Sequence, residues 1–84
     1  MIKLVCMGKL GSLLPPDWEA VPLPTEVHTL AGLRAWLAQA LPDLGAAMAQ
    51  TSVKAIVNLS VAHNMATPIR DGDEIAFMPP MSGG

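Results

Sequence analysis

Apolar and polar positions alternate near the N-terminus in the way that predicts a β-strand. Residues 2–7 have a period of two, so Ile2 and Leu4 are expected to face the core together with Cys6, whereas Met7 lies on the opposite face. Shorter or weaker strands are predicted at residues 18–23, 54–59 and 61–63. Pro22 lacks an N–H group for a ladder, so strand 18–23 is expected at a sheet edge.

A helical period appears in the middle of the chain. Thr29 is a good N-cap residue, and the leucines that follow it recur at spacings of three, four and four on one helical face: Leu30, Leu33, Leu37 and Leu41. Pro42 ends this helix, because a proline disfavours helical backbone in the residue before it. A second, short helix is predicted over residues 44–50, with Asp43 as its cap.

The C-terminal stretch is predicted to begin as a strand and to continue as an extended tail. Residues 74–78 alternate so that Ile75 and Phe77 face the core. Two prolines then stop the strand and favour an extended, stiff exit. A Gly-Gly end has no side chain to clash in a narrow channel of another protein. We therefore expect an exposed tail over residues 79–84, which are Pro79, Pro80, Met81, Ser82, Gly83 and Gly84.

The order of these elements predicts an α+β fold of the β-grasp type. Two strands, a main helix, a short helix and three further strands are best combined as a mixed sheet with the main helix packed across one face. The first and last strands are expected to pair in parallel at the centre. With 84 residues, no internal repeat and no linker, residues 1–84 are expected to form one domain.

Composition narrows the classes of function. Hydrophobic residues make up 51% of the chain and charged residues 14%, which suggests that some apolar surface is left for a partner. The net charge is −2 without a basic run, so nucleic-acid binding has little support. A single cysteine and the lack of a signal peptide or a membrane-spanning run favour a cytoplasmic protein that does not engage a membrane.

The side chains offer little chemistry of their own. His28 and His63 have no cysteine or carboxylate at a metal-ligand spacing, so no metal site is expected. Cys6 alternates with core residues and is interpreted as a structural thiol.

The acidic group at residues 71–74 could in principle supply an acid and a base, but turn chemistry at Asp71 and a solvated strand edge explain it better. By elimination, the most reactive feature is the carboxylate of Gly84, which becomes an electrophile once it is adenylated by a partner enzyme. A frayed terminus without a function is the alternative.

A second functional feature is an apolar outer surface. If Ile75 and Phe77 face the core, Met78 faces outward and lies near Met7 on the neighbouring strand. Methionines form adaptable surfaces at protein interfaces. For Met48, filling a gap in the core is the preferred interpretation.

Several segments resemble one known family. Residues 71–77 (Asp-Gly-Asp-Glu-Ile-Ala-Phe), followed by prolines 79–80 and by Ser-Gly-Gly at 82–84, closely resemble the C-terminal signature of the molybdopterin synthase small subunit family, whose fold is similar to that of ubiquitin. Residues 1–4 and 57–58 also resemble this family at the expected distances.

The resemblance implies a sulfur-carrier cycle. A ubiquitin-activating-like adenylyltransferase would use ATP and Mg²⁺ to adenylate Gly84, and a sulfur donor would convert the adenylate to a thiocarboxylate. The tail would then enter a large synthase subunit, with which the chain forms a heterotetramer, and would donate sulfur to a pterin precursor. The chain itself would bind no cofactor and would not catalyse alone, but would be the sulfur-donating subunit of a sulfurtransferase complex. The family's apolar partner patch corresponds to Met7, Val61 and Met78.

Other functions fit the same fold and Gly-Gly end. One is a sulfur carrier for thiamine synthesis or tRNA thiolation, another is a ubiquitin-like protein modifier, and a third is an interaction domain with an inert tail. The Phe77-x-Pro79-Pro80 run favours the molybdenum pathway.

Overall fold

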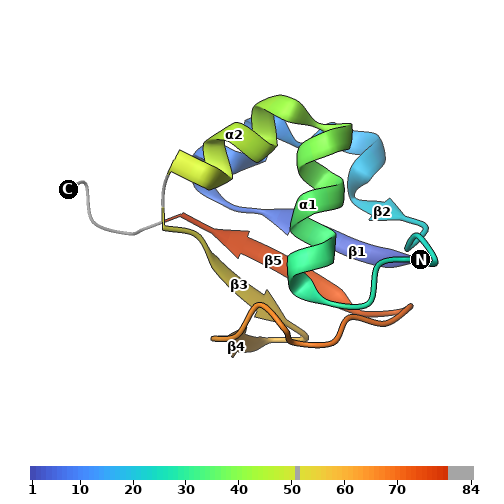
Figure 1. Ribbon diagram of the computed structural model, residues 1–84. Helices are drawn as coiled ribbons and strands as arrows, with labels where there is room; N and C mark the ends of the chain where they lie inside the picture. The colour runs from blue at the N-terminus through green and yellow to red at the C-terminus, as the bar shows by residue number, and fades with distance from the viewer. Residues whose placement is uncertain (51, 80–84) are drawn as a thin grey trace.

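The computed structural model describes residues 1–50 and 52–79 as one mixed sheet with helices on one side (Figure 1). Within these residues, five strands lie in the order β2-β1-β5-β3-β4. The elements in chain order are β1 (Ile2–Cys6), η1 (Gly8–Leu13), η2 (Pro16–Trp18), β2 (Ala20–Val21), α1 (Leu30–Ala40), α2 (Pro42–Gln50), β3 (Lys54–Val57), β4 (Ser60–Ala62) and β5 (Glu74–Met78). This is the predicted β-grasp arrangement.

The last strand lies in the middle of the sheet. β5 pairs in parallel with β1, where Leu4 lies opposite Ile75, and antiparallel with β3, where Ala55 lies opposite Phe77. The predicted parallel pairing of the first and last strands is therefore confirmed. As a result, β5 is hydrogen-bonded on both sides and joins the β1–β2 hairpin to the β3–β4 hairpin.

The core lies between the sheet and α1. Thr29 begins the helix as predicted, since its Oγ1 accepts a hydrogen bond from the Gly32 N–H at 3.2 Å. The buried hydrophobic residues of the described part are Ile2, Leu4, Leu10, Val21, Val27, Leu30, Leu33, Leu37, Leu44, Met48, Ala55, Ile69, Ile75 and Phe77. Met48 is thus a core residue, as interpreted from the sequence.

Several predicted boundaries differ in the structure. The strand predicted at 54–59 ends at Val57, because Asn58 and Leu59 adopt positive φ angles in the turn, and the strand predicted at 61–63 begins one residue earlier, at Ser60.

The second strand has only two residues, because Trp18 belongs to η2, where its ring lies 5.2 Å from that of Trp36, and because Pro22 cannot donate to the ladder. α2 begins at Pro42 instead of after Asp43, since proline suits the first turn of a helix. Asp43 lies inside that first turn.

The segment between β1 and β2 is more ordered than the predicted loop. Residues 8–13 and 16–18 form 3₁₀ turns, and Leu10 reaches the core. In the described part of the chain, no helix has the length and apolar character needed to cross a membrane.

Candidate functional site

An apolar surface covers the side of the sheet opposite the helices. Side chains alternate along strands, so the neighbours of the buried Leu4, Ile75 and Phe77 point to this other side. The strand register places one row of residues across four strands: Val5, Ala76, Ile56 and Val61. With Met7 and Met78, this row is called the outer sheet face below.

The predicted partner patch lies on the outer sheet face. Cys6 is paired with Phe77, so Met7 and Met78 follow as neighbours at the end of β1 and β5. Val61 lies on β4, two strands from Met78. Met7 is 44% exposed and Val61 49% exposed, and Met78 is half-buried. The structure thus brings all three residues to one surface, whereas their binding of a partner stays a prediction.

Sequence reasoning missed one member of this surface. Ile56 lies between Ala76 and Val61 and joins the two parts of the patch. Alternation along the strand predicted at residues 54–59 would have found it, because Ala55 is buried in the core and adjacent strand residues face opposite sides.

Charged residues border the outer sheet face. Lys3 Nζ lies 3.9 Å from Glu74 Oε2 at one end, and Lys54 is paired with Met78 at the other. The Lys3–Glu74 pair is well exposed and contributes little to stability. Its position suits a polar rim around an apolar centre, which is a common arrangement in protein interfaces.

The base of the predicted tail is joined to β1. The Met7 N–H donates a hydrogen bond to the Phe77 carbonyl oxygen at 3.0 Å. Pro79 is half-buried instead of fully exposed. The other predicted tail residues lie outside the described residues, and these are Pro80, Met81, Ser82, Gly83 and Gly84.

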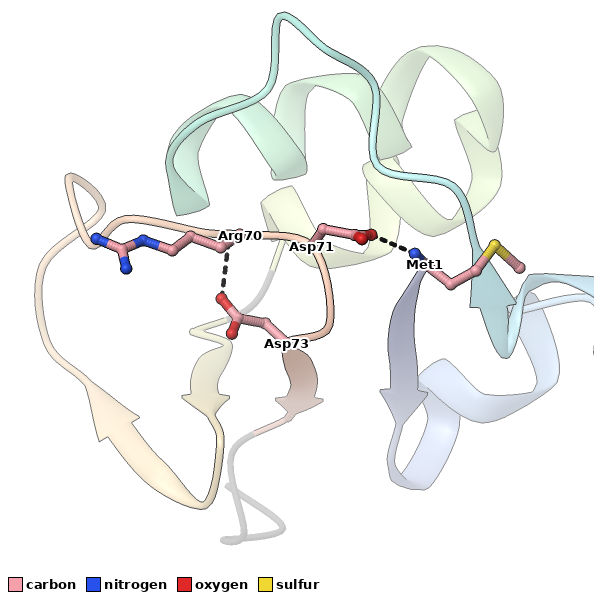
Figure 2. Close-up of polar contacts among 4 residues, drawn as sticks. All are labelled: Met1, Arg70, Asp71 and Asp73. Carbon is pink, nitrogen blue, oxygen red and sulfur yellow. Dashed lines mark hydrogen bonds and ion pairs between the residues drawn. The ribbon is translucent and has the colours of Figure 1, made fainter.

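The acidic residues of the 70–73 turn have structural partners (Figure 2). Asp73 accepts a hydrogen bond from the Arg70 N–H at 2.8 Å and another from the Asn58 side-chain amide at 3.0 Å. Asp71 forms an ion pair with the N-terminal amine of Met1. These contacts support the interpretation of this group as turn chemistry.

The thiol of Cys6 is not poised as a nucleophile. Cys6 is half-buried and packs against the core, and burial raises the pKa of its thiol. It lines a shallow cavity of about 370 Å³ together with Lys3, Gly11, Leu14 and Glu19. Among the described residues, no group of three histidine, cysteine, aspartate or glutamate side chains could hold a metal ion.

The strand order and the likeness to solved structures define a small ubiquitin-like β-grasp protein, and its outer sheet face is apolar. More particularly, the chain belongs to the ThiS family, whose model matches residues 10–84. It is 30% identical to the molybdopterin synthase sulfur carrier subunit of Escherichia coli over 84 residues, which cover all of both chains. The resemblance inferred from the sequence is therefore confirmed.

Solved structures agree on the fold. SAMP1 from Haloferax volcanii superposes with a TM-score of 0.71 at 18% identity, covering 99% of this chain and 98% of that one. A chain from the complex of subunits 1 and 2 of the molybdopterin-converting factor of Helicobacter pylori gives a TM-score of 0.63 at 24% identity, covering 99% and 97%.

Proposed function

We propose that the chain is the sulfur-carrier small subunit of a molybdopterin synthase. The observation that carries this proposal is the full-length likeness to the sulfur carrier subunit of Escherichia coli. The apolar outer sheet face supports it, because a carrier must dock on successive partner enzymes. The proposed setting is the cytoplasm.

The proposed reaction takes place at the carboxylate of Gly84. One carboxylate oxygen attacks the α-phosphorus of ATP on an adenylyltransferase, and pyrophosphate leaves. Hydrosulfide supplied by a sulfur donor then attacks the acyl carbon, AMP leaves, and the product is the Gly84 thiocarboxylate, in which sulfur keeps its oxidation level. ATP and Mg²⁺ belong to the activating enzyme, and this chain supplies the acyl group.

In a large subunit, the thiocarboxylate sulfur would then attack a carbon of the pterin precursor, forming a carbon–sulfur bond while an oxygen substituent leaves that carbon. After hydrolysis of the resulting acyl link, the carboxylate is regenerated and can be charged again. A dithiolene contains two sulfur atoms, so two charged carriers are consumed for each product. The complex of two subunits in Helicobacter pylori supports a large-subunit partner, and two copies of each chain would form the heterotetramer.

The mass of the intact chain tests this proposal. The chain is incubated with the adenylyltransferase, ATP and a sulfur source. We expect a species heavier by one sulfur-for-oxygen exchange that maps to the peptide with Gly84 and is absent when Gly84 is deleted. A mass that never changes would exclude a sulfur carrier.

Charge substitutions test the docking role of the outer sheet face. Met78→Lys replaces an apolar side chain of this face with a charge, next to Lys54 on the paired strand, and is expected to weaken binding to the large subunit at least about tenfold. Met65→Lys is the matched control, because Met65 is an exposed methionine in the loop after β4 whose sulfur contacts Arg34. Equal binding by the two variants would contradict the assignment.

The match to the ThiS family model keeps a sulfur carrier for thiamine or for tRNA as a second candidate. Such a carrier would also form the thiocarboxylate. The charged chain is therefore mixed with the large subunit and the pterin precursor, and conversion of the precursor assigns the molybdenum pathway. A protein modifier would instead yield conjugates on lysines.

A further inference from the structure

Gly8 lies directly against Pro79, at the point where the chain leaves β5. Its φ of +58° is in the left-handed region, which favours glycine. A β-carbon at Gly8 would lie 3.1 Å from Cγ and 3.7 Å from Cδ of Pro79. The shorter distance is below an ordinary carbon–carbon contact. The backbone therefore favours glycine, and a β-carbon at Gly8 would require the Pro79 ring to shift by a few tenths of an ångström.

The turn that carries Gly8 is held firmly on both sides. Before it, the Met7 N–H is bonded to the Phe77 carbonyl oxygen at 3.0 Å. After it, the Leu10 N–H donates to the Met7 carbonyl oxygen at 3.2 Å, and the Leu10 side chain is 2% exposed in the core. Pro79 thus rests on a fixed surface, and not on a loop that could yield to it.

We propose that Gly8 is a positioning residue, which sets the direction of the chain at Pro79 for the acyl chemistry at Gly84. The inference rests on the proposed function. Proline has a fixed φ, so a displacement of its ring turns the chain that follows. Misplacing a reacting group by about 1 Å can lower a rate by about 100-fold, even when the change lies far from the reacting atoms.

The substitution Gly8→Asn tests this role. Asparagine tolerates left-handed backbone, so it adds a β-carbon against Pro79 with the least backbone strain. Gly72→Asn is the matched control, because Gly72 also has a positive φ of +91° but no heavy atom within 4 Å of its β-carbon position. Both variants are expected to lose similar thermal stability.

The readout is formation of the Gly84 thiocarboxylate at varied carrier concentration. For Gly8→Asn we expect kcat to fall at least about tenfold with KM within about threefold, because docking on the outer sheet face is retained while the reacting group is displaced. For Gly72→Asn we expect both constants to stay within about twofold, as for an uncoupled surface site. A kcat for Gly8→Asn equal to that of the unsubstituted chain would overturn the inference.

A double substitution shows whether Gly8 acts through Pro79. Pro79→Ala removes Cγ and Cδ, so Gly8→Asn is expected to slow the reaction by less than about twofold in that background. If Gly8→Asn lowered kcat by the same factor with Pro79 and with Ala at position 79, the inference would be overturned. Pro79 lies beyond the core, so Pro79→Ala alone is expected to lower kcat without changing the melting temperature. An unchanged kcat for Pro79→Ala would also overturn the inference. If the unsubstituted chain takes up no sulfur, the proposed function itself fails and this inference fails with it.

Discussion

Asn58 joins two turns that are distant in the sequence. Its φ is +50°, its side-chain amide donates to Asp73 at 3.0 Å, and its side-chain oxygen accepts from the Glu74 N–H at 2.9 Å. Asn58→Ala is expected to destabilise the fold by about 2–3 kcal/mol, because it loses both hydrogen bonds and strains the backbone. Urea denaturation measures this. Asn58→Gly tolerates the positive φ and should therefore lose less stability than Asn58→Ala. Equal losses of stability in the two variants would mean that the turn geometry contributes nothing.

Gly45 allows α1 and α2 to approach closely. A β-carbon at Gly45 would lie 2.6 Å from both Cα and Cβ of Ala38. Gly45→Ala is therefore expected to cost about 1–3 kcal/mol, as for an overpacked site. Thermal unfolding is the measurement, and Gly32→Ala is the matched control. At Gly32 the nearest atom is Thr29 Oγ1 at 3.5 Å, so alanine should stabilise α1 by up to about 1 kcal/mol. If Gly45→Ala and Gly32→Ala changed the stability in the same direction, this explanation would be contradicted.

The raised pKa of Cys6 predicts a dependence of stability on pH. Its ordinary value is 9.0, and burial favours the neutral thiol in the folded state. As the pH rises, the Cys6 thiol ionises in the unfolded chain before it ionises in the folded one. The contribution of the buried thiol to folding stability is therefore complete below pH 9 and declines as the pH rises toward the folded pKa. Denaturation between pH 7 and pH 10 should show the decline, and Cys6→Ala should lack it. Alkylation of the native thiol at pH 9 should also be slower than in urea.

The turn between β3 and β4 contains an unfavourable residue. Leu59 has a φ of +69° and is 88% exposed. A bulky side chain in left-handed backbone is strained, and Asn-Gly is the preferred pair for such a two-residue hairpin turn. Leu59→Gly is therefore expected to stabilise the fold by about 1 kcal/mol in thermal unfolding. A loss of stability would show that Leu59 makes contacts that compensate for its strain.

The elements with a clear period could be predicted from sequence, and those set by tertiary contacts could not. The Thr29 cap and the leucine stripe are local signals, and α1 begins where they indicate. By contrast, the 3₁₀ turn at residues 8–13 has no periodic pattern. It is ordered by the burial of Leu10, whose N–H is bonded to Met7, and Met7 in turn is bonded to Phe77 of β5. The contact with β5 joins residues far apart in the sequence, so no local pattern encodes it.

The same limit applies to the candidate site. Alternation along β5 places Met78 on the outer sheet face, and the structure agrees. The junction of Ile56 with Val61 depends on which strands pair, and the contact of Gly8 with Pro79 joins residues 71 positions apart. The contact of Gly8 with Pro79 follows from the assembled sheet, and the sequence carries no local signal for it. Ile56 could have been found by alternation along its strand.

At the scale of the whole molecule, the fold depends on its last strand. All the buried hydrophobic residues of the described part lie between Ile2 and Phe77. Removing residues 80–84 is therefore expected to leave the melting temperature within about 3 °C, which corresponds to less than about 1 kcal/mol for a domain of this size. Removing residues 74–84 should abolish cooperative unfolding, because β1 and β3 both lose their partner. A folded product from the longer deletion would contradict the central role of β5.

The central place of β5 also has a consequence for biosynthesis. A ribosome that makes this chain has already released β1, both helices and β3 before β5 emerges, and until then the sheet stays open along the edges of β1 and β3. A translation product that stops before Glu74 would keep these edges unpaired and would be open to proteases. In a cell, the surviving population would consist of molecules that contain β5, so protein quality control would remove products that end before Glu74.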